Sequence, residues 1–371
     1  DHGFPEYFQK IAGPKSVAFA NGPQHKRLRN MCLRSVSDKR LAVYLPILQE
    51  LSARHLARWA EQGAAEATPK DIHFQIKKFA FQSGQAAVLG PSVTEEEVNR
   101  LMHLFDLAIA GIKCAAPVNL PGFPFHSSMS AGRQLKKHCG TFADRRRSAL
   151  QRSGMPTCML DALLLEGMSD AELADNCVTM MLAGHDTTAA STHSILYRLK
   201  QLPKLETELR MEVDKIWDGV SPITRSHLEA MPRTSSFLQE VWRSAPPISF
   251  IARKLKEDVE ADGFVVPRGW NLAYFPAGDF STAPNPKTFM PDRYLDAEGR
   301  FVDSTSDATA FEVFGGGARM CIGYKFAKDE LLVFLMCFLK GYDLEIKSSK
   351  PKSLPFRSYS IEGRFLKRTC L

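Results

Sequence analysis

Near its C-terminus the chain reads Phe314-Gly315-Gly316-Gly317-Ala318-Arg319-Met320-Cys321-Ile322-Gly323, a glycine-rich loop that carries one arginine and one cysteine. Glycines allow sharp turns and let the main chain approach a bound group closely. Residues 324–340 follow with apolar residues at helical spacing, so Cys321 is expected at the N-terminus of a helix. Free N–H groups and the positive end of the helix dipole favour a thiolate there. The loop therefore predicts a thiolate that ligates the metal of a bound cofactor. Arg319 is placed to bind an anionic group of that cofactor.

Two other kinds of glycine-rich loop are excluded by their spacing. A phosphate-binding loop ends in Gly-Lys-Ser or Gly-Lys-Thr, and a dinucleotide fingerprint requires a glycine where Met320 stands. A buried structural thiol is the plainer alternative for any single cysteine. We expect that plainer role for the remaining cysteines, which are Cys32, Cys114, Cys139, Cys158, Cys177, Cys337 and Cys370.

The decapeptide also matches, residue for residue, the signature Phe-x-x-Gly-x-Arg-x-Cys-x-Gly, and the chain thereby resembles the cytochrome P-450 superfamily of haem-thiolate monooxygenases. The resemblance extends from His25 to the terminal hairpin. It implies a mainly α fold with a small β region and a long central helix over the haem. It also implies a non-covalent haem b with Cys321 as the axial iron ligand. The loop residues that it assigns to the cofactor are Phe314, Gly317, Arg319, Cys321 and Gly323.

The composition agrees with a globular enzyme. The 371 residues are 44% hydrophobic and 24% charged, which are ordinary proportions for a folded protein. The cysteines show no regular spacing and no Cys-x-x-Cys-His run, so neither a disulfide framework nor covalent haem attachment is expected. The net charge of +7 is modest and spread out, so we expect an acidic partner protein rather than a nucleic acid.

We expect residues 1–371 to form one haem-thiolate monooxygenase domain. The chain begins with Asp1, and the first motifs of the family are missing, so we interpret it as a fragment without its N-terminal part and without any membrane anchor. The longest apolar run, Leu331 to Leu339, is about half as long as a membrane span requires. No transmembrane helix is therefore expected.

Hydrophobic periodicity predicts helices along most of the chain. The longest begins at a capping box, Ser169-Asp170-Ala171-Glu172, and continues to Gln201, ahead of Pro203. Alternating apolar residues predict a small sheet within Phe250 to Tyr274. We expect further helices at 27–59 (as a pair), 71–89, 94–113, 131–153, 205–217, 235–244 and 324–340, loops at 117–124 and 284–293, and hairpin strands at 342–347 and 360–367.

The long helix contains the unusual run Ala183-Gly184-His185-Asp186-Thr187-Thr188, in which a glycine and two β-branched residues weaken the helix locally. The small residues Ala183 and Gly184 predict a groove for a diatomic ligand, and Thr187 can bond an upstream carbonyl. The run resembles the family motif Ala-Gly-x-Asp/Glu-Thr, which implies that Thr187 and Asp186 are catalytic and deliver protons. The alternative is a kinked structural helix with Asp186 on a solvated face. His185 occupies the variable position, and we expect no ligand role for it.

Two further groups of residues are expected to support the haem. Glu240 and Arg243 resemble the family pair Glu-x-x-Arg, and Arg293 would be their partner in a buried structural network; the alternative is an exposed ion pair of little value. His25 and Arg29 resemble the Trp-x-x-x-Arg pair of the family, with histidine in place of tryptophan, and their charge would suit haem propionates. Arg253 is a third propionate candidate. Solvated surface positions are the alternative for these three residues.

The resemblance implies that one atom of O2 enters a lipophilic substrate, such as a sterol, retinoid, terpenoid or fatty acid. Electrons would come from NAD(P)H through a separate reductase or ferredoxin, because the chain has no nucleotide or flavin fingerprint. The substrate contacts that we expect are Ala183, Ile248, Phe250, Ile251 and Tyr359. The basic residues that we expect to dock the redox partner are Lys26, Arg27, Arg34, Lys325 and Lys328.

We expect a monomer that acts in lipid metabolism at the cytosolic face of the endoplasmic reticulum membrane; a plastid or soluble location stays open. Two other functions also stay open. A haem-thiolate isomerase or dehydratase acting on peroxides would share the Cys321 loop but would not need the Thr187 alcohol. A non-catalytic haem-binding fragment is the other.

Overall fold

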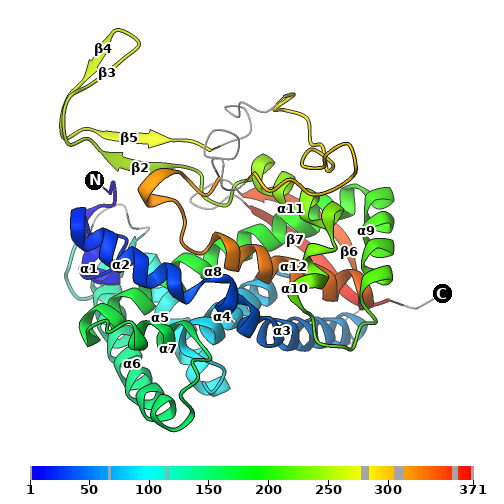
Figure 1. The fold of residues 1–371 in the computed structure, drawn as a ribbon, viewed down its shortest axis with the longest axis horizontal. Helices are drawn as coiled ribbons and strands as arrows, with labels where there is room; N and C mark the ends of the chain where they lie inside the picture. The colour runs from blue at the N-terminus through cyan, green and yellow to red at the C-terminus, as the bar shows by residue number, and fades with distance from the viewer. Residues whose placement is uncertain are drawn as a thin grey trace. The chain divides into compact units, whose positions relative to one another are not determined.

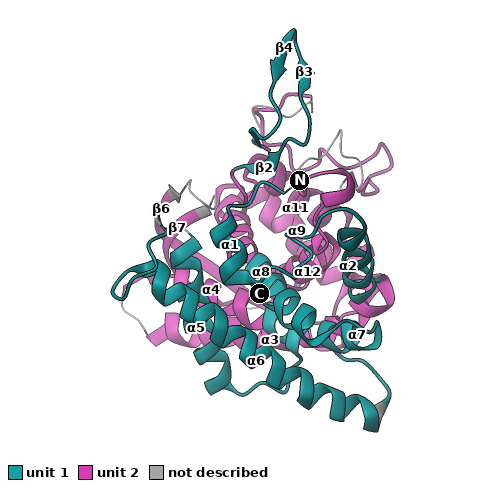
Figure 2. Ribbon diagram, turned by 90° about the vertical axis from the view of Figure 1, so that its left-hand side faces the viewer, with its two compact units in different colours: residues 1–37, 84–183, 250–275 teal, residues 38–83, 184–249, 276–371 magenta. Residues whose placement is uncertain are grey.

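The computed structural model describes residues 2–65, 68–112, 114, 117–276, 284–304, 313–352 and 358–368. The chain forms two compact units, drawn in teal and magenta in Figure 2. Unit 1 comprises residues 1–37, 84–183 and 250–275, and unit 2 comprises residues 38–83, 184–249 and 276–371. Helices dominate the described residues, and the strands are few, so the prediction of a mainly α fold with a small β region is confirmed.

Unit 1 contains five complete helices among its described residues. They are α1 (Glu6–Ala12), α2 (Gly22–Ser35), α5 (Glu95–Ile112), α6 (Pro124–Ser153) and α7 (Met159–Leu165). Helices α5 and α6 pack closely, because a Cβ atom at Gly111 would lie 2.1 Å from the Ser128 hydroxyl oxygen. That hydroxyl donates to the carbonyls of Leu107 and Pro124, which ties the first turn of α6 to α5.

The β part of unit 1 consists of two small antiparallel pairs. Strand β2 (Ile251–Lys254) pairs with β5 (Asn271–Tyr274), and β3 (Val259–Ala261) pairs with β4 (Phe264–Val266). The β3–β4 hairpin extends away from the β2–β5 pair (Figure 1). Its turn contains Asp262 and Gly263, both with positive φ angles of 50° and 79°. The predicted β region around Gly263 is confirmed.

Unit 2 is built around α12 (Tyr324–Gly341), whose apolar run is buried. It also contains α3 (Asp38–Ala65), α9 (Pro203–Ile216), α10 (Arg225–Glu229) and α11 (Pro232–Ser244). Its sheet has the order β1 (Lys70–Asp71), β7 (Ser358–Lys367) and β6 (Tyr342–Lys352), with antiparallel neighbours. Helix α3 packs on α12 and β7; a Cβ atom at Gly63 would lie 2.1 Å from the Phe365 carbonyl oxygen.

Two helices contribute to both units, α4 (His73–Leu89) and α8 (Asp170–Gln201). The bounds of α8 agree with the predicted bounds. Glu172 accepts hydrogen bonds from the Ser169 amide at 3.2 Å and from the Ser169 hydroxyl at 2.9 Å, as the capping box predicts. The break between α2 and α3 falls at Val36 and Ser37, as the predicted helix pair requires.

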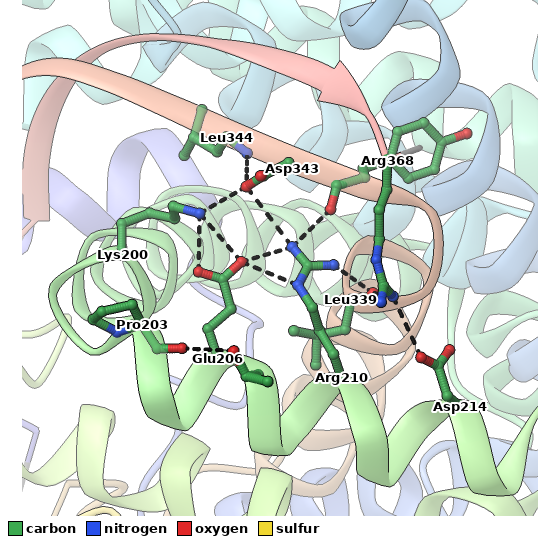
Figure 3. Close-up of polar contacts among 11 residues, drawn as sticks. Lys200, Pro203, Glu206, Arg210, Asp214, Leu339, Asp343, Leu344 and Arg368 are labelled. Carbon is green, nitrogen blue, oxygen red and sulfur yellow. Dashed lines mark hydrogen bonds and ion pairs between the residues drawn. The ribbon is translucent and has the colours of Figure 1, made fainter. Parts of the chain in front are cut away.

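A polar network lies in unit 2 at the junction between the end of α12 and the start of β6 (Figure 3). Arg210 of α9 is buried and donates to the carbonyls of Leu339 at 2.5 Å and Tyr342 at 2.9 Å, which lie at the C-terminal end of α12. Glu206 accepts from Arg210 at 2.6 Å and from Lys200 of α8 at 2.9 Å. The network therefore joins the ends of α8, α9 and α12.

The structure differs from the predicted elements mainly in short helices. Helices α1, α7 and α10 were not predicted, because five to seven residues are too few for a clear apolar periodicity. Helix α6 begins at Pro124 rather than at residue 131, with proline in its first turn. The terminal hairpin is confirmed, and its strands are longer than predicted. Among the described helices, none is both long and apolar enough to cross a membrane.

Candidate active site

The Cys321 loop folds into a tight turn directly ahead of α12. The Cys321 amide donates to the Phe314 carbonyl at 2.9 Å, and the Met320 amide donates to the Gly317 carbonyl at 3.2 Å. Gly315 and Gly317 have φ angles of 69° and 61°, a region that residues with a side chain rarely adopt. The turn leaves the Cys321 side chain exposed, three residues ahead of the first residue of α12.

The other described cysteines have a different environment. Burial raises the pKa of the thiols of Cys32, Cys139, Cys158 and Cys337 to about 12. Burial also raises the pKa of the Cys177 thiol well above its usual value. In the absence of a metal these thiols stay protonated at neutral pH, as is typical of structural cysteines. Cys114 is half-buried, and Cys370 lies outside the described residues.

A tryptophan connects the Cys321 loop to α8. The Phe314 ring packs edge-to-face on the Trp242 ring of α11, with centroids 5.0 Å apart. The Trp242 indole N–H donates to the Ser191 hydroxyl of α8 at 3.0 Å. Trp242 is almost completely buried. A rigid aromatic side chain therefore sets the distance between the loop and α8.

Helix α8 provides open space at the predicted oxygen-binding motif. A Cβ atom at Gly184 would meet no atom within 4 Å outside its own helix neighbourhood, and Ala183 beside it is exposed. The Thr187 hydroxyl donates to the Gly184 carbonyl at 3.4 Å, the upstream carbonyl bond that we expected. His185 is buried, and its ring packs edge-to-face on Phe81 at 5.2 Å, which agrees with a core histidine.

These features fit a haem. Open space also surrounds the Cβ positions of Gly317 and Gly323, so a flat group can approach the main chain on both sides of the exposed Cys321 side chain. Arg319 is half-buried and lies in the 3-10 turn Gly317–Arg319. A thiolate ligand, an arginine for a carboxylate and glycines for close approach are the donor set that a haem needs.

The supporting network around Glu240 is buried and fully hydrogen-bonded. Glu240 has no exposed surface, and its oxygens accept from Arg243 at 2.7 and 2.8 Å and from Arg293 at 3.0 Å. The Met290 amide also donates to Glu240, at 2.8 Å. Both arginines donate to the Thr288 carbonyl. The structure thus brings the three predicted network residues together, and they hold the irregular segment at residues 284–293.

The predicted propionate ligands outside the loop belong to unit 1. His25 is buried and Arg29 is half-buried, one turn apart on α2. Arg253 of β2 is half-buried, and burial lowers its pKa. Among the described residues no carboxylate forms an ion pair with Arg253, so a desolvated cation is available for an anionic ligand.

The predicted substrate contacts differ in exposure. Ile248 and Ile251 are half-buried, and Phe250 is exposed, with its ring 6.0 Å from that of Phe275. The Tyr359 ring stacks on Tyr197 of α8 with centroids 3.8 Å apart. Tyr197 lies ten residues after Thr187, which corresponds to about 15 Å along the helix. The stack therefore directs Tyr359 to a part of α8 remote from Thr187.

Most of the predicted basic docking residues form ion pairs within their own units. Arg27 pairs with Glu172, and Arg34 pairs with Glu166. In unit 2, Lys325 pairs with Asp38 at 2.8 Å, and Lys328 pairs with Asp303 at 2.6 Å. Lys26 is exposed. These acids reduce the positive potential that the sequence alone suggested.

Sequence reasoning missed several side chains that organise the site. They are Ser83, Thr188, Ser191, Trp242 and Glu330. One signal was available, because Glu330 directly precedes the apolar run of its helix and so places a carboxyl next to the core. The Trp242–Ser191 bond joins residues 51 positions apart and has no local pattern.

Known proteins share the sequence pattern and the fold of this chain. Residues 3–363 match the family model described as Cytochrome P450. The chain is 28% identical over 356 residues to cytochrome P450 85A1 of Oryza sativa subsp. japonica (92% of this chain, 73% of the relative). It is 26% identical over 367 residues to abscisic acid 8'-hydroxylase 1 of Arabidopsis thaliana (92% of this chain, 71% of the relative).

A solved structure described as retinoic acid bound cyanobacterial CYP120A1 has the same fold, with a TM-score of 0.84 at 23% identity over 99% of this chain and 84% of that chain. The family model spans almost all of the sequence, including the Cys321 loop and the Gly184–Thr187 turn. The chain therefore belongs to the cytochrome P450 family and is a haem-thiolate monooxygenase of a lipophilic substrate.

Proposed function

We propose that this monooxygenase hydroxylates a sterol, a retinoid, another terpenoid or a fatty acid, with electrons from NAD(P)H delivered by a separate reductase or ferredoxin. The observation that carries the proposal is the open space at the Cβ position of Gly184, whose carbonyl accepts from the Thr187 hydroxyl, in the same unit as the exposed Cys321. A relative named for abscisic acid and a solved structure with bound retinoic acid support a terpenoid substrate.

The reaction consumes the substrate, O2, two electrons and two protons, and it yields the hydroxylated substrate and water. A haem held by Cys321 supplies the reductive activation of O2. The protein would contribute the remaining functions. Cys321 would hold the iron as a thiolate, Arg319 would bind a haem carboxylate, and the α12 dipole would stabilise the thiolate.

We assign proton delivery to Thr187 and Asp186. The Thr187 hydroxyl already bonds within its own helix turn, so it can exchange the Gly184 carbonyl for a water or a ligand by rotating its side chain. Asp186 is half-buried beside it and can carry protons from solvent. His25, Arg29 and Arg253 are our candidates for additional haem propionate contacts.

The redox partner and the cellular location are part of the same proposal. We infer an acidic partner protein, a monomeric enzyme, and action at the cytosolic face of the endoplasmic reticulum membrane. The ion pairs at Arg27, Arg34, Lys325 and Lys328 predict that docking responds to salt less strongly than the number of basic residues suggests.

The first experiment is the difference spectrum of the reduced protein with carbon monoxide. We expect the band position of a thiolate-ligated haem, its loss in Cys321→Ser, and its retention in Cys114→Ser, which keeps a donor to the Gly111 carbonyl. An imidazole-type spectrum in the wild type would contradict the assignment of Cys321.

A second experiment identifies the substrate class. Sterols, retinoids, terpenoids and fatty acids are titrated while the haem absorption is followed, and ligands that bind are then incubated with reductase and NADPH. We expect a hydroxylated product that requires reductant. Turnover of a lipid hydroperoxide without reductant would instead favour an isomerase or dehydratase.

A further inference from the structure

Glu330 is a buried carboxyl to which the proposed mechanism assigns no role. It lies on α12, nine residues after Cys321, and is 2% exposed. One of its oxygens accepts a hydrogen bond from the Thr188 hydroxyl of α8 at 3.1 Å, and the other accepts one from the Ser83 hydroxyl of α4. Ser83 and Thr188 are themselves buried. Three helices, α4, α8 and α12, therefore meet at one carboxyl group within unit 2.

Burial of the Glu330 carboxyl lowers the stability of the folded protein, which a purely structural contact would not require. Burial raises the pKa of Glu330 to about 7, and only the two hydroxyls act in the opposite direction. Among the described residues no cation forms an ion pair with Glu330. A buried acid without a cation stabilises a fold less well than an apolar side chain of similar size. The contact is better explained by what it positions.

The Glu330 contact falls on the functional turn of α8. Thr188 directly follows Thr187, whose hydroxyl donates to the Gly184 carbonyl. Three residues further along the same helix face, Ser191 accepts from Trp242, which contacts the Cys321 loop through Phe314. Glu330 and Trp242 thus join this face of α8 to α12 and α11 by two side-chain hydrogen bonds. The Glu330 bond is the one next to Thr187.

We propose that Glu330 is a positioning residue for the monooxygenase reaction: through its hydrogen bond to Thr188 it sets the rotation of the α8 turn that carries Gly184 and Thr187. The inference rests on the proposed role of Thr187. It assigns Glu330 no contact with substrate, haem or O2. Its loss should misplace the Thr187 hydroxyl while leaving the Cys321 ligand in place.

The test uses variants of the holoenzyme that break the bond from either side. Thr188→Val keeps the size of the side chain and removes the hydroxyl, and Glu330→Leu removes the carboxyl. Glu330→Gln is the conservative variant, because its amide oxygen can still accept from Thr188 while its NH2 donates to Ser83. The Ser83 hydroxyl can then turn to the Ala80 carbonyl, which it already approaches at 3.3 Å.

Thr192→Val is the matched control. The Thr192 hydroxyl is equally buried on α8 but donates at 2.9 Å to the Thr188 carbonyl of its own helix, so it does not reach α12. If Thr188→Val alone fails to fold, Glu330→Gln and Glu330→Leu still separate the hydrogen bond from the carboxylate charge.

Two readouts report on the distal turn. The first is the C–O stretching frequency of the reduced carbon monoxide complex, which senses polar groups near the ligand and needs no turnover. The second is the hydrogen peroxide released per NADPH consumed. We expect Thr188→Val and Glu330→Leu to shift the frequency and to raise peroxide release by about fivefold, the factor that one hydrogen bond represents. Glu330→Gln and Thr192→Val should resemble the wild type.

The outcomes distinguish failure of the proposed function from failure of the proposed role of Glu330. If the wild type lacks a thiolate-type carbon monoxide spectrum, the proposed function fails. If the wild type shows that spectrum but Thr188→Val matches Thr192→Val in both readouts, only the role of Glu330 fails. If Glu330→Gln behaves like Glu330→Leu, the carboxylate charge matters rather than the bond to Thr188, and the positioning role is overturned.

Discussion

At the scale of single residues, the site depends on side chains that are chemically ordinary but unusually placed. Cys321 differs from the buried cysteines only in its exposure and its place ahead of a helix. Thr187 and Thr188 are adjacent and chemically identical, yet one bonds within α8 and the other bonds Glu330. Position therefore decides which hydroxyl bonds within α8 and which bonds across to α12.

Replacement of Thr187 by valine should leave substrate binding intact and divert electrons from product to hydrogen peroxide, because proton delivery loses its hydroxyl. Thr187→Ser keeps the hydroxyl and should retain most of the product yield. Product and peroxide are measured per NADPH consumed. Equal yields in both variants would exclude a role for the hydroxyl.

The pKa of Glu330 predicts a pH dependence of stability. Because this pKa is raised from 4.5 to about 7, the folded protein holds the proton more tightly than the unfolded chain. The contribution of Glu330 to the free energy of unfolding is therefore largest below pH 4.5. It falls as the pH rises towards 7, by at most about 3 kcal/mol. In Glu330→Gln this contribution disappears.

Urea unfolding of the wild type and Glu330→Gln at pH 5.5 and pH 8 checks the sign. The wild type should lose stability relative to the variant at the higher pH. A difference in the opposite direction, or none, would contradict the buried, uncompensated carboxyl.

At the scale of secondary-structure elements, α8 and α12 carry the site, and α11 connects them. The sequence predicted the extent of α8 because its capping box and the following proline mark both ends. It did not predict that Trp242 of α11 spans from Phe314 to Ser191, since that contact depends on how three elements pack.

Trp242→Phe tests this connection. The phenyl ring can keep the packing on Phe314, but the hydrogen bond to Ser191 is lost, which should cost about 1–2 kcal/mol of stability. Trp242→Ala also creates a cavity and should cost about 3–5 kcal/mol and reduce haem retention. Thermal unfolding and the haem content of the purified variants give the measurement. Equal effects of both variants would show that the indole N–H carries the whole contribution.

At the scale of the whole molecule, buried charged side chains bind the backbone of irregular segments in unit 2. Glu240 neutralises Arg243 and Arg293, and the two arginines satisfy carbonyl groups of the segment at residues 284–293. Arg210 does the same for the end of α12 (Figure 3). Such groups replace the regular backbone hydrogen bonds that irregular segments lack.

Glu240→Ala should therefore destabilise the protein by about 3–5 kcal/mol, because two buried arginines lose their carboxylate. The matched control is Asp292→Ala, which removes a half-exposed acid paired with Arg233 at 3.3 Å and should cost less than about 1 kcal/mol. Chemical denaturation of both variants measures the difference. If both variants lowered the free energy of unfolding by a similar small amount, the Glu240 network would contribute no more than a surface ion pair.

The longer helices, the Cys321 loop and the Gly184–Thr187 run could be predicted without a structure, because each is encoded by neighbouring residues. Periodicity, capping and glycine spacing act over at most a few turns, so they can be read without a structure. The bounds of α8 and the β region around Gly263 show how far this local information reaches.

Which distant side chains meet depends on how the folded chain packs. The Glu330 contacts with Thr188 and Ser83 join residues 142 and 247 positions apart, and the stack of Tyr359 on Tyr197 joins β7 to α8. Arg27, Arg34, Lys325 and Lys328 likewise found acidic partners that no local pattern marks. Long-range pairing depends on the packing of helices, and packing is a property of the folded chain rather than of any segment.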